Sequence, residues 1–183
     1  MQQSPNITLT PIERHNLVTI HQWLKDSDEF YYMTDWFFSK PNLDEIEIWY
    51  NSLINNNRTK VFMIYCNHLK TPVGIAEVSR IDWKNRHAYL GILIGNKANR
   101  NKGYATKALK IIIKMCFEQI NLNKLYATVI ESNISSIKLF EKLGFQKEAQ
   151  LKKHSFIDNT YQDQIIFSLL KEDYEKNKDL YND

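Results

Sequence analysis

The sequence contains only two cysteines and no apolar run long enough to cross a membrane. Its 183 residues include no window of the roughly 18 apolar residues that a transmembrane helix needs. Residues 1–6 lack the charged and apolar regions of a signal peptide. Cys66 and Cys116 lie in apolar stretches without a CxxC motif or a nearby histidine pair, so we expect buried free thiols and no metal site. These absences favour the reducing cytoplasm and argue against a membrane partner.

The chain also lacks a strong charge of either sign. Twenty-four Lys and Arg residues oppose 21 Asp and Glu residues, for a net charge of +3. No basic run alternates with aromatic residues, as a nucleic-acid stacking surface would require, so we expect no nucleic-acid partner. Low-complexity linkers and internal repeats are absent, and 43% hydrophobic and 13% aromatic residues are typical of a globular protein. The composition therefore predicts one folded domain over residues 1–183.

Hydrophobic periodicity predicts alternating strands and helices. Strands are predicted at Ile7–Thr10, Val61–Cys66, Val73–Ile81, His87–Ile94, Lys124–Ile130, Phe145–Lys152 and Tyr161–Leu170. Helices are predicted at Ile12–Lys25, Leu43–Ile54, Thr106–Glu118 and between a capping Asn133 and a terminating Gly144. The tail, Lys171–Asp183, is interpreted as a solvated helix end. Consecutive strands predict antiparallel hairpins, and the strand–helix–strand unit predicts a parallel pair, so the fold class is α/β with a mixed sheet.

The segment Arg100–Ala105 separates an apolar strand pattern from the longest helix pattern. Backbone N–H groups that converge at such a loop, together with the positive end of the helix dipole, can hold a diphosphate without a metal. A side chain at Gly103 would keep the backbone away from the phosphate. A simple strand-to-helix turn that contains one glycine is the alternative interpretation of the loop alone.

Two motifs resemble those of the GNAT superfamily of N-acetyltransferases. Arg100, Gly103 and Ala105 match the superfamily's Arg/Gln-x-x-Gly-x-Gly/Ala acyl-CoA loop. The pattern Asn-x-x-Ser-x-x-x-(Tyr/Phe)-Glu-Lys-x-Gly-Phe is matched by Asn133, Ser136, Phe140, Glu141, Lys142, Gly144 and Phe145. The resemblance extends from Ile7 to about Tyr174 and includes the branch that acts on ribosomal-protein termini and spermidine. It implies a mostly antiparallel central sheet, flanked by helices, that splays open between its fourth and fifth strands.

The resemblance also implies which residues hold acetyl-CoA, the expected cosubstrate. The pantetheine arm would pair with backbone near Leu93 and Ile94, where N–H groups could also polarise the thioester carbonyl. The expected cofactor-binding residues are Leu93, Ile94, Gly95, Arg100, Asn101, Lys102, Gly103, Tyr104, Ala105, Thr106, Asn133, Ser136 and Phe140. Homodimerisation, which is common among GNAT proteins, is an expectation of the same kind.

The reaction implied by the resemblance is direct attack of an amine on the thioester, which needs a base to deprotonate the amine. Glu77 is the first candidate base, because it lies in a mostly apolar strand pattern where partial burial would suit it to accept a proton. The alternative for Glu77 is an exposed strand residue or a structural ion pair. Glu131, just before Asn133, is the second candidate, and its alternative is a loop charge. Phe140 stands where many relatives have a tyrosine that protonates the leaving thiolate, so that acid must come from elsewhere or be absent.

The acceptor is expected over residues 26–50 and 154–161. In these regions and on the fourth strand, the candidate substrate-binding residues are Asp28, Glu29, Asp35, Trp36 and Tyr89, because acids and ring faces can hold a cationic amine. Spermidine acetyltransferases usually have Glu-Glu where this chain has Phe38 and Ser39, so the acceptor stays open among polyamines, other small amines, amino sugars and protein N-termini. An acyl-CoA-binding sensor or interaction protein with little catalysis is the alternative function.

Overall fold

A computed structural model of the chain describes residues 5–26, 40–157 and 159–182. The chain divides into two compact units. The first unit comprises Met1–Ser79 and Gly91–Ala108, and the second comprises Arg80–Leu90 and Leu109–Asp183. Strands β3 (Thr71–Asp82) and β4 (His87–Ile94) and helix α3 (Tyr104–Lys114) therefore contribute residues to both units. A single domain over residues 1–183 stays a prediction.

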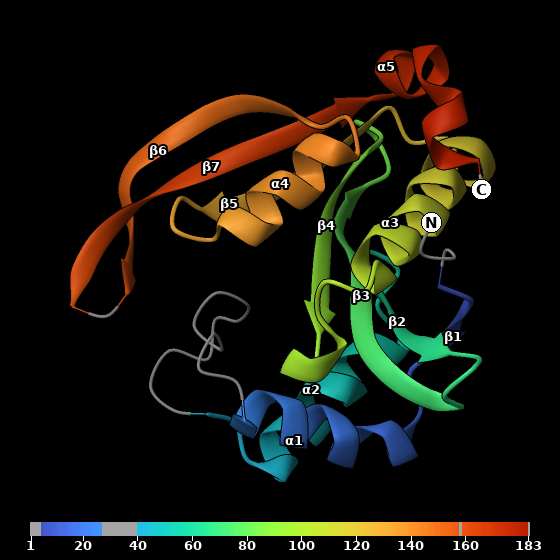
Figure 1. The fold of residues 1–183 in the computed structure, drawn as a ribbon, viewed down its shortest axis with the longest axis vertical. Coiled ribbons are helices and arrows are strands. Elements are labelled where there is room, and N and C mark those ends of the chain that lie inside the picture. Colours follow the sequence, from blue (N-terminus) through green and yellow to red (C-terminus); the bar gives the residue numbers. More distant parts are fainter. Residues whose placement is uncertain (1–4, 27–39, 158, 183) are drawn as a thin grey trace. The chain divides into compact units, whose positions relative to one another are not determined.

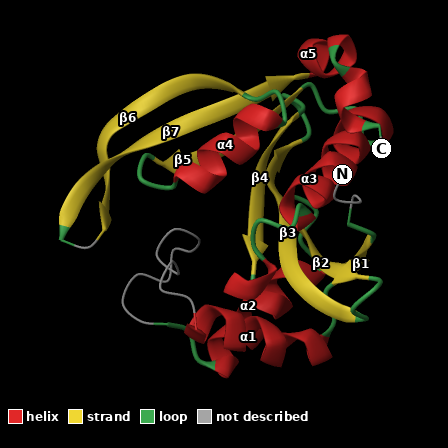
Figure 2. Ribbon diagram, in the orientation of Figure 1, coloured by secondary structure: helices red, strands yellow, loops and turns green. Residues whose placement is uncertain are grey.

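The helices and strands follow the predicted order (Figures 1 and 2). The strands are β1 Ile7–Pro11, β2 Lys60–Cys66, β3 Thr71–Asp82, β4 His87–Ile94, β5 Lys124–Ile130, β6 Gln146–Ile157 and β7 Thr160–Leu170. The α-helices are α1 Leu17–Asp26, α2 Leu43–Ile54, α3 Tyr104–Lys114, α4 Ile134–Lys142 and α5 Lys171–Lys176. Short turns of 3-10 helix are η1 Arg14–Asn16, η3 Lys97–Asn99 and η5 Lys178–Tyr181, and η4 Met115–Gln119 is a π-helical turn that continues α3.

The seven strands form one mixed sheet in the order β1-β2-β3-β4-β5-β7-β6. The pairs β1–β2, β2–β3, β5–β7 and β6–β7 are antiparallel, while β4 and β5 are parallel. Both the mixed α/β class and the parallel pair around α3 are confirmed. The parallel ladder aligns His87, Ala88 and Tyr89 with Lys124, Leu125 and Tyr126. The predicted opening of the sheet beyond these pairs stays a prediction.

The core of the first unit joins the two N-terminal helices to β2 and β4. Helices α1 and α2 lie side by side in Figure 2. Their buried residues cluster with Val61, Met63 and Leu93, and Trp49, Tyr50 and Leu53 of α2 pack against the same cluster. One face of α2 is therefore apolar. Asn42 and Glu45 set the start of α2, since each side chain accepts from the other's backbone N–H.

The core of the second unit contains aromatic rings that contact one another. Phe140 of α4 lies 5.2 Å from Phe145 and 6.2 Å from Phe167 of β7, measured between ring centroids. Beside η4, the ring of Tyr174 lies 5.0 Å from Phe117 and 4.9 Å from Tyr181. These contacts attach α4 to β7 and the C-terminal helices to η4.

Several predicted elements differ from the structure. The helix predicted from Ile12 begins as η1 at Arg14. Asn16 donates its N–H to the Glu13 carbonyl at 2.9 Å, and its side-chain oxygen accepts the Glu13 N–H. Helix α3 begins at Tyr104 instead of Thr106. The strand predicted to end at Lys152 continues as β6 to Ile157, because pairing with β7 carries it on, so most of residues 154–161 is hairpin and not loop.

The C-terminal tail also differs from the prediction. It was interpreted as solvated, yet Tyr174 and Tyr181 are buried. The Tyr174 hydroxyl donates to the Glu118 carboxylate at 2.8 Å, and the Tyr181 hydroxyl donates to the Leu143 carbonyl at 2.5 Å. Burial and the bond to Glu118 raise the pKa of Tyr174, and burial raises the pKa of Tyr181 to about 12. The tail is therefore part of the core of the second unit.

Candidate functional site

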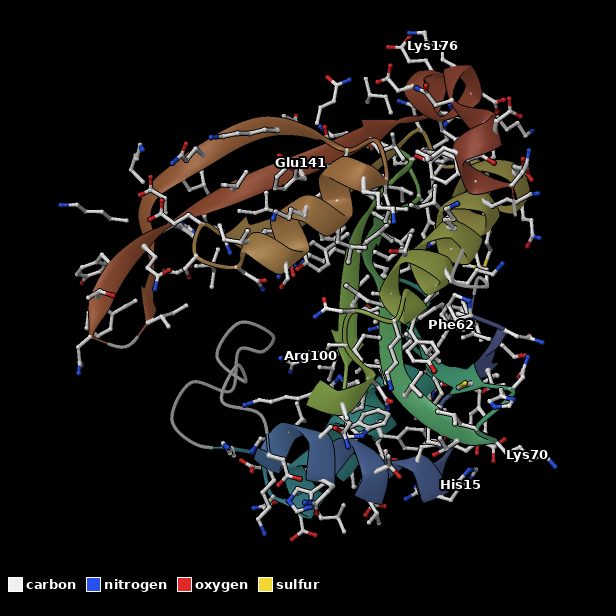
Figure 3. The ribbon with its side chains drawn as sticks, in the orientation of Figure 1. His15, Phe62, Lys70, Arg100, Glu141 and Lys176 are labelled. Atoms are coloured by element: carbon white, nitrogen blue, oxygen red, sulfur yellow. The ribbon has the colours of Figure 1, made fainter. Side chains whose placement is uncertain are left out.

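The loop between β4 and α3 is shaped by two residues with left-handed backbone conformation. Asn96 caps η3 by accepting the Ala98 N–H at 2.8 Å, and the Arg100 N–H then donates to the Lys97 carbonyl at 3.1 Å. Asn101 has φ 58° and Gly103 has φ 83°. Asparagine tolerates this conformation, whereas glycine adopts it without strain. Figure 3 marks Arg100 at the entrance to this turn.

The first turn of α3 presents N–H groups that have no partner in the helix ladder. The first bond of that ladder runs from the Lys107 N–H to the Gly103 carbonyl at 3.0 Å. The N–H groups from Gly103 to Thr106 therefore precede it, at the positive end of the helix dipole. This arrangement can hold an anion such as a diphosphate. The structure gives a second reason for glycine at residue 103, because its φ of 83° would strain any residue with a Cβ atom.

The carboxyl end of β4 is closely packed within the first unit. Leu93 is buried, and a Cβ atom on Gly74 of β3 would overlap its carbonyl oxygen. The Gly95 N–H donates to the Val73 carbonyl at 3.0 Å, and a Cβ atom on Gly95 would overlap the ring of Trp23. The backbone at the predicted pantetheine contact is thus held in place, although the N–H of Gly95 is already used by β3.

Glu77 occupies the middle of β3 in the first unit. It is half-buried and pairs with Val61 of β2. Ile75 is also half-buried, while Ala76 and Val78 on the opposite side of the strand are buried. The predicted alternation stops at Ser79, which is buried, and at Arg80, which has φ 51°. Glu77 therefore lies on the less buried face of β3, and its role as a base stays a prediction.

Tyr89 belongs to the second unit, at the last pair of the β4–β5 ladder. The guanidinium carbon of Arg80 lies 5.1 Å from the centroid of its ring. The Tyr89 hydroxyl is 3.4 Å from the Thr128 hydroxyl, and the ring of Tyr126 meets its edge at 5.6 Å. Sequence reasoning did not find Arg80 and Thr128, because neither residue matches a motif and Thr128 is 39 positions from Tyr89 in the chain. Binding of an acceptor by Tyr89 stays a prediction.

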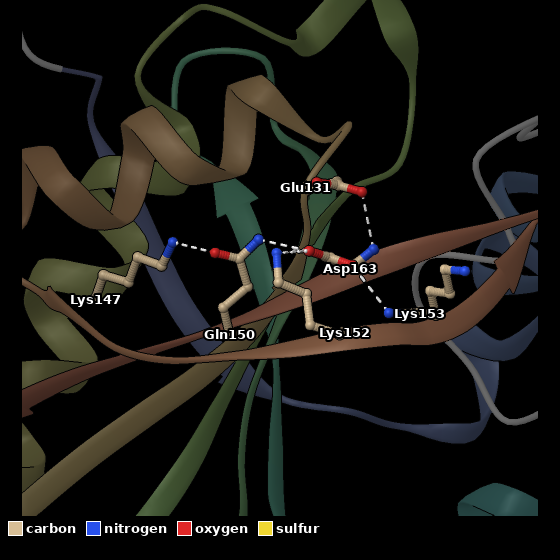
Figure 4. Close-up of polar contacts among 6 residues, drawn as sticks. All are labelled: Glu131, Lys147, Gln150, Lys152, Lys153 and Asp163. Atoms are coloured by element: carbon tan, nitrogen blue, oxygen red, sulfur yellow. Dashed lines mark hydrogen bonds and ion pairs between the residues drawn. The ribbon is translucent and has the colours of Figure 1, made fainter.

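Glu131 joins β5 to β7 through a network centred on Asp163 (Figure 4). Its carboxylate accepts the Asp163 N–H at 2.9 Å, and its own N–H donates to the Asp163 carbonyl at 3.0 Å. The Asp163 carboxylate accepts from Lys152 and Gln150 at 2.6 Å each and from the Lys153 N–H at 2.9 Å. Glu131 thus attaches the end of β5 to β7. Its role as the second candidate base stays a prediction.

The Asp163 network predicts an acid-sensitive hairpin. The bonds from Lys152, the Lys153 N–H and Gln150 lower the pKa of Asp163 from 3.8 to about 2. Because the folded pKa lies below the unfolded value, the carboxylate stabilises the fold above about pH 4, and this stabilisation is lost as the pH falls toward 2. We expect Asp163→Asn to lower Tm at pH 7 and the difference from wild type to shrink below pH 4. Thermal unfolding followed by circular dichroism at several pH values measures it.

The exposed Asp179→Asn is the control, and it should leave Tm unchanged. A difference between Asp163→Asn and wild type that persists unchanged to pH 2 would contradict the assignment.

Asn133, Ser136 and Phe140 belong to α4 and the residue before it. The Asn133 side-chain oxygen caps the helix by accepting the Ser136 N–H at 3.1 Å and the Ser135 hydroxyl at 2.9 Å. The capping role predicted for Asn133 is confirmed. Within the described part of the chain, no partner is recorded for its side-chain NH₂ group, which keeps donors for a ligand. Phe140 is buried in the aromatic core, and cofactor contacts by these three residues stay predictions.

Four of the candidate substrate-binding residues lie outside the described part of the chain. Asp28, Glu29, Asp35 and Trp36 fall in residues 27–39, which the structure does not describe. Residues 5–26, 40–157 and 159–182 contain no group of three His, Cys, Asp or Glu side chains that could hold a metal ion. In the same ranges no helix is long and apolar enough to cross a membrane. Both cysteines are free and buried, as predicted.

Comparisons with known proteins agree with this geometry. The model of the acetyltransferase (GNAT) domain family matches residues 6–146. Spermidine N(1)-acetyltransferase of Escherichia coli (strain K12) is 28% identical over 176 residues, covering 95% of this chain and 91% of that protein. The crystal structure of spermidine N-acetyltransferase from Vibrio cholerae in complex with CoA and spermine has a TM-score of 0.83 at 29% identity, covering 92% of this chain and 98% of that one. A dodecameric structure of the Vibrio cholerae enzyme has a TM-score of 0.80 at 28% identity, covering 94% and 97%.

Proposed function

Because the chain belongs to the GNAT family of acetyltransferases, we propose that it acetylates a polyamine at the expense of acetyl-CoA. It is an acetyl-CoA-dependent N-acetyltransferase, and the polyamine is the finer part of the proposal. Similarity to spermidine acetyltransferases supports that choice, since it extends over 95% of the chain and so beyond the donor loop. Phe38, Ser39 and Phe140 depart from the spermidine enzymes, which leaves the preferred polyamine to experiment.

The observation that carries the donor assignment is the left-handed loop at the start of α3. Asn101 and Gly103 turn the chain so that the N–H groups from Gly103 to Thr106 precede the helix ladder. They receive the diphosphate of acetyl-CoA, whose charge the helix dipole stabilises. The backbone of Leu93 and Ile94 pairs with the pantetheine arm in the manner of an added strand.

The reaction is attack of an unprotonated amine on the thioester carbon. Glu77 removes the proton from the ammonium group, directly or through water, and the resulting amine nitrogen bonds to the acetyl carbon. The carbon–sulfur bond then breaks and CoA leaves as a thiolate. Phe140 has no hydroxyl to protonate it. The thiolate therefore departs unassisted or takes its proton from another group.

We also propose that the chain acts in the cytoplasm, as one acetyltransferase domain that forms homo-oligomers. The Vibrio cholerae enzyme is described as dodecameric. The proposed homo-oligomer therefore includes assemblies larger than the expected homodimer. Light scattering coupled to size-exclusion chromatography, with and without spermine, measures the oligomeric state directly. A monomer under both conditions would overturn the assembly part alone.

Release of free CoA thiol in the presence of acetyl-CoA tests the proposed function. We expect release with spermidine or spermine, less with amino sugars and N-terminal peptides, and background values without an acceptor. A thiol-reactive chromophore suits the assay because Cys66 and Cys116 are buried. Acetyl-CoA binding without thiol release for any acceptor would replace the enzyme by an acyl-CoA-binding sensor. Release with a peptide or an amino sugar but no polyamine would correct the acceptor.

A further inference from the structure

Tyr104, the first residue of α3, directs its side chain away from the loop and into the first unit. Only 7% of its surface is exposed, although Lys102 and Gly103 just before it are exposed. Its hydroxyl lies 3.4 Å from the Cys66 sulfur, at hydrogen-bond distance for a sulfur atom. The residue that opens the predicted diphosphate-binding turn therefore has a buried polar contact 38 positions away in the chain.

Cys66 is a fixed point of the sheet. As the last residue of β2 it pairs with Ile7 of β1 on one side and with Thr71 of β3 on the other, and it is 3% exposed. Burial raises the pKa of its thiol, but hydrogen bonds from the Tyr104 hydroxyl and from the N–H groups of Leu69 and His68 outweigh burial, so that the pKa is lowered. The sulfur is thus surrounded by hydrogen-bonding groups, one of which belongs to α3.

A second contact holds the same loop from the N-terminal side. A methyl group at Gly103 would touch Pro5 at 3.4 Å, so Pro5 lies beside the turn. The segment of Pro5 is itself attached to the β2–β3 turn, because Asn67 donates its N–H to the Asn6 carbonyl at 3.1 Å and its side-chain NH₂ to the Asn6 side chain at 2.7 Å. Both attachments originate at adjacent residues, Cys66 and Asn67.

We propose that Cys66 and the Tyr104 hydroxyl form an anchor that holds the first turn of α3 ready to bind the diphosphate of acetyl-CoA. Neither side chain touches the ligand in this account, so both are positioning residues. The proposal rests on the proposed function for its ligand and on the first unit alone for its geometry. Without the anchor, the N–H groups from Gly103 to Thr106 have to be ordered at the moment of binding, which weakens affinity.

The matched experiment compares buried tyrosine hydroxyls in the two units. Tyr104→Phe removes the hydroxyl and keeps the ring, and Tyr181→Phe does the same at the bond to Leu143, remote in sequence from the loop. We expect Tyr104→Phe to raise both the Kd and the KM for acetyl-CoA roughly three- to tenfold and to leave kcat within a factor of two of the wild-type value. Calorimetry measures the Kd, and steady-state kinetics measures KM and kcat. Tyr181→Phe should lower Tm and leave Kd and KM at the wild-type value.

Cysteine variants test the other half of the anchor. Cys66→Ala removes the hydrogen-bonding atom and should raise Kd as Tyr104→Phe does, whereas Cys66→Ser keeps a polar atom and should restore part of the affinity. In the double variant Tyr104→Phe/Cys66→Ala, the effects should be less than additive, because one bond is lost once. An unchanged Kd in both single variants, or an equal rise in Tyr181→Phe, would overturn the anchor.

Hydrogen exchange of the protein without ligand keeps this test separate from the proposed function. We expect Tyr104→Phe to accelerate amide exchange in residues 103–108 by about the same factor by which it raises the Kd for acetyl-CoA. Tyr181→Phe should leave the exchange of those amides unchanged. If the wild-type protein bound no acetyl-CoA, the proposed function would fail, while exchange at residues 103–108 would still decide the anchor. Equal exchange in wild type and Tyr104→Phe would overturn it.

Discussion

Glu77→Gln is expected to lower kcat by roughly a hundred- to ten-thousandfold, the usual contribution of a general base. Glutamine has nearly the same shape and keeps hydrogen-bonding atoms on the half-buried face of β3, but it cannot accept the proton of the ammonium group. The affinity for acetyl-CoA should change by less than about twofold, since the donor is held by main-chain N–H groups. Steady-state kinetics near neutral pH, together with calorimetry for acetyl-CoA, measures both quantities.

Two further variants make the result specific. Glu175→Gln removes an exposed carboxylate of α5 and should behave as wild type. Glu131→Gln tests the second candidate, and it should also weaken the attachment of β5 to β7, because Glu131 accepts the Asp163 N–H. Turnover unaltered in Glu77→Gln but abolished in a folded Glu131→Gln would transfer the role of base to Glu131. Unaltered turnover in both would remove both residues from the mechanism.

Gly95→Ala is expected to cause the largest loss of stability. A Cβ atom at this position would overlap three ring atoms of Trp23, which is itself buried against α2 and β2. Overpacking of this kind costs about 2 to 3 kcal/mol, which lowers the Tm of a chain of this length by roughly 5 to 10 °C. Thermal and urea unfolding of the wild-type and variant proteins measures the change.

A double-variant cycle identifies the cause of that loss. Trp23→Ala is itself destabilising, but it opens the space that the new methyl group needs. Gly95→Ala should therefore cost only a few tenths of a kcal/mol in the Trp23→Ala background. An equal cost in both backgrounds would show that backbone conformation, and not contact with Trp23, makes glycine necessary at residue 95.

Much of the fold could be predicted because its signals are local. The bounds of α2, β4 and β5 agree with prediction, and in α2 a capping box of Asn42 and Glu45 begins a regular apolar face. Errors occurred where distant residues decide the outcome. Strand β6 continues past Lys152 because β7 offers partners as far as Thr160. The tail is held in the core because the Tyr174 hydroxyl donates to the Glu118 carboxylate and the Tyr181 hydroxyl donates to the Leu143 carbonyl.

The candidate site shows the same division. Two short motifs, around Gly103 and Asn133, were sufficient to predict a GNAT acetyltransferase and its donor, because each motif is contained in a few neighbouring positions of the chain. The acceptor could not be predicted, since the residues expected to bind it, such as Trp36 and Tyr89, lie in separate segments and share no motif. Glu77 illustrates the limit, because a strand pattern indicates burial but not what a carboxylate faces.

The sequence by itself determined the order of elements, the parallel pair around α3, the cap at Asn133, and the position of the loop before α3. The individual elements, the cap and the loop arise from residues within a few positions of one another, where propensity and periodicity act directly. The parallel pair follows from the strand–helix–strand order of these local elements. Only the tertiary structure decided that Cys66 meets Tyr104, that Trp23 covers Gly95 and that Arg80 lies over the ring of Tyr89. Such contacts join residues that are close in the fold but distant in the chain, and no local pattern records which distant side chain will fill the space.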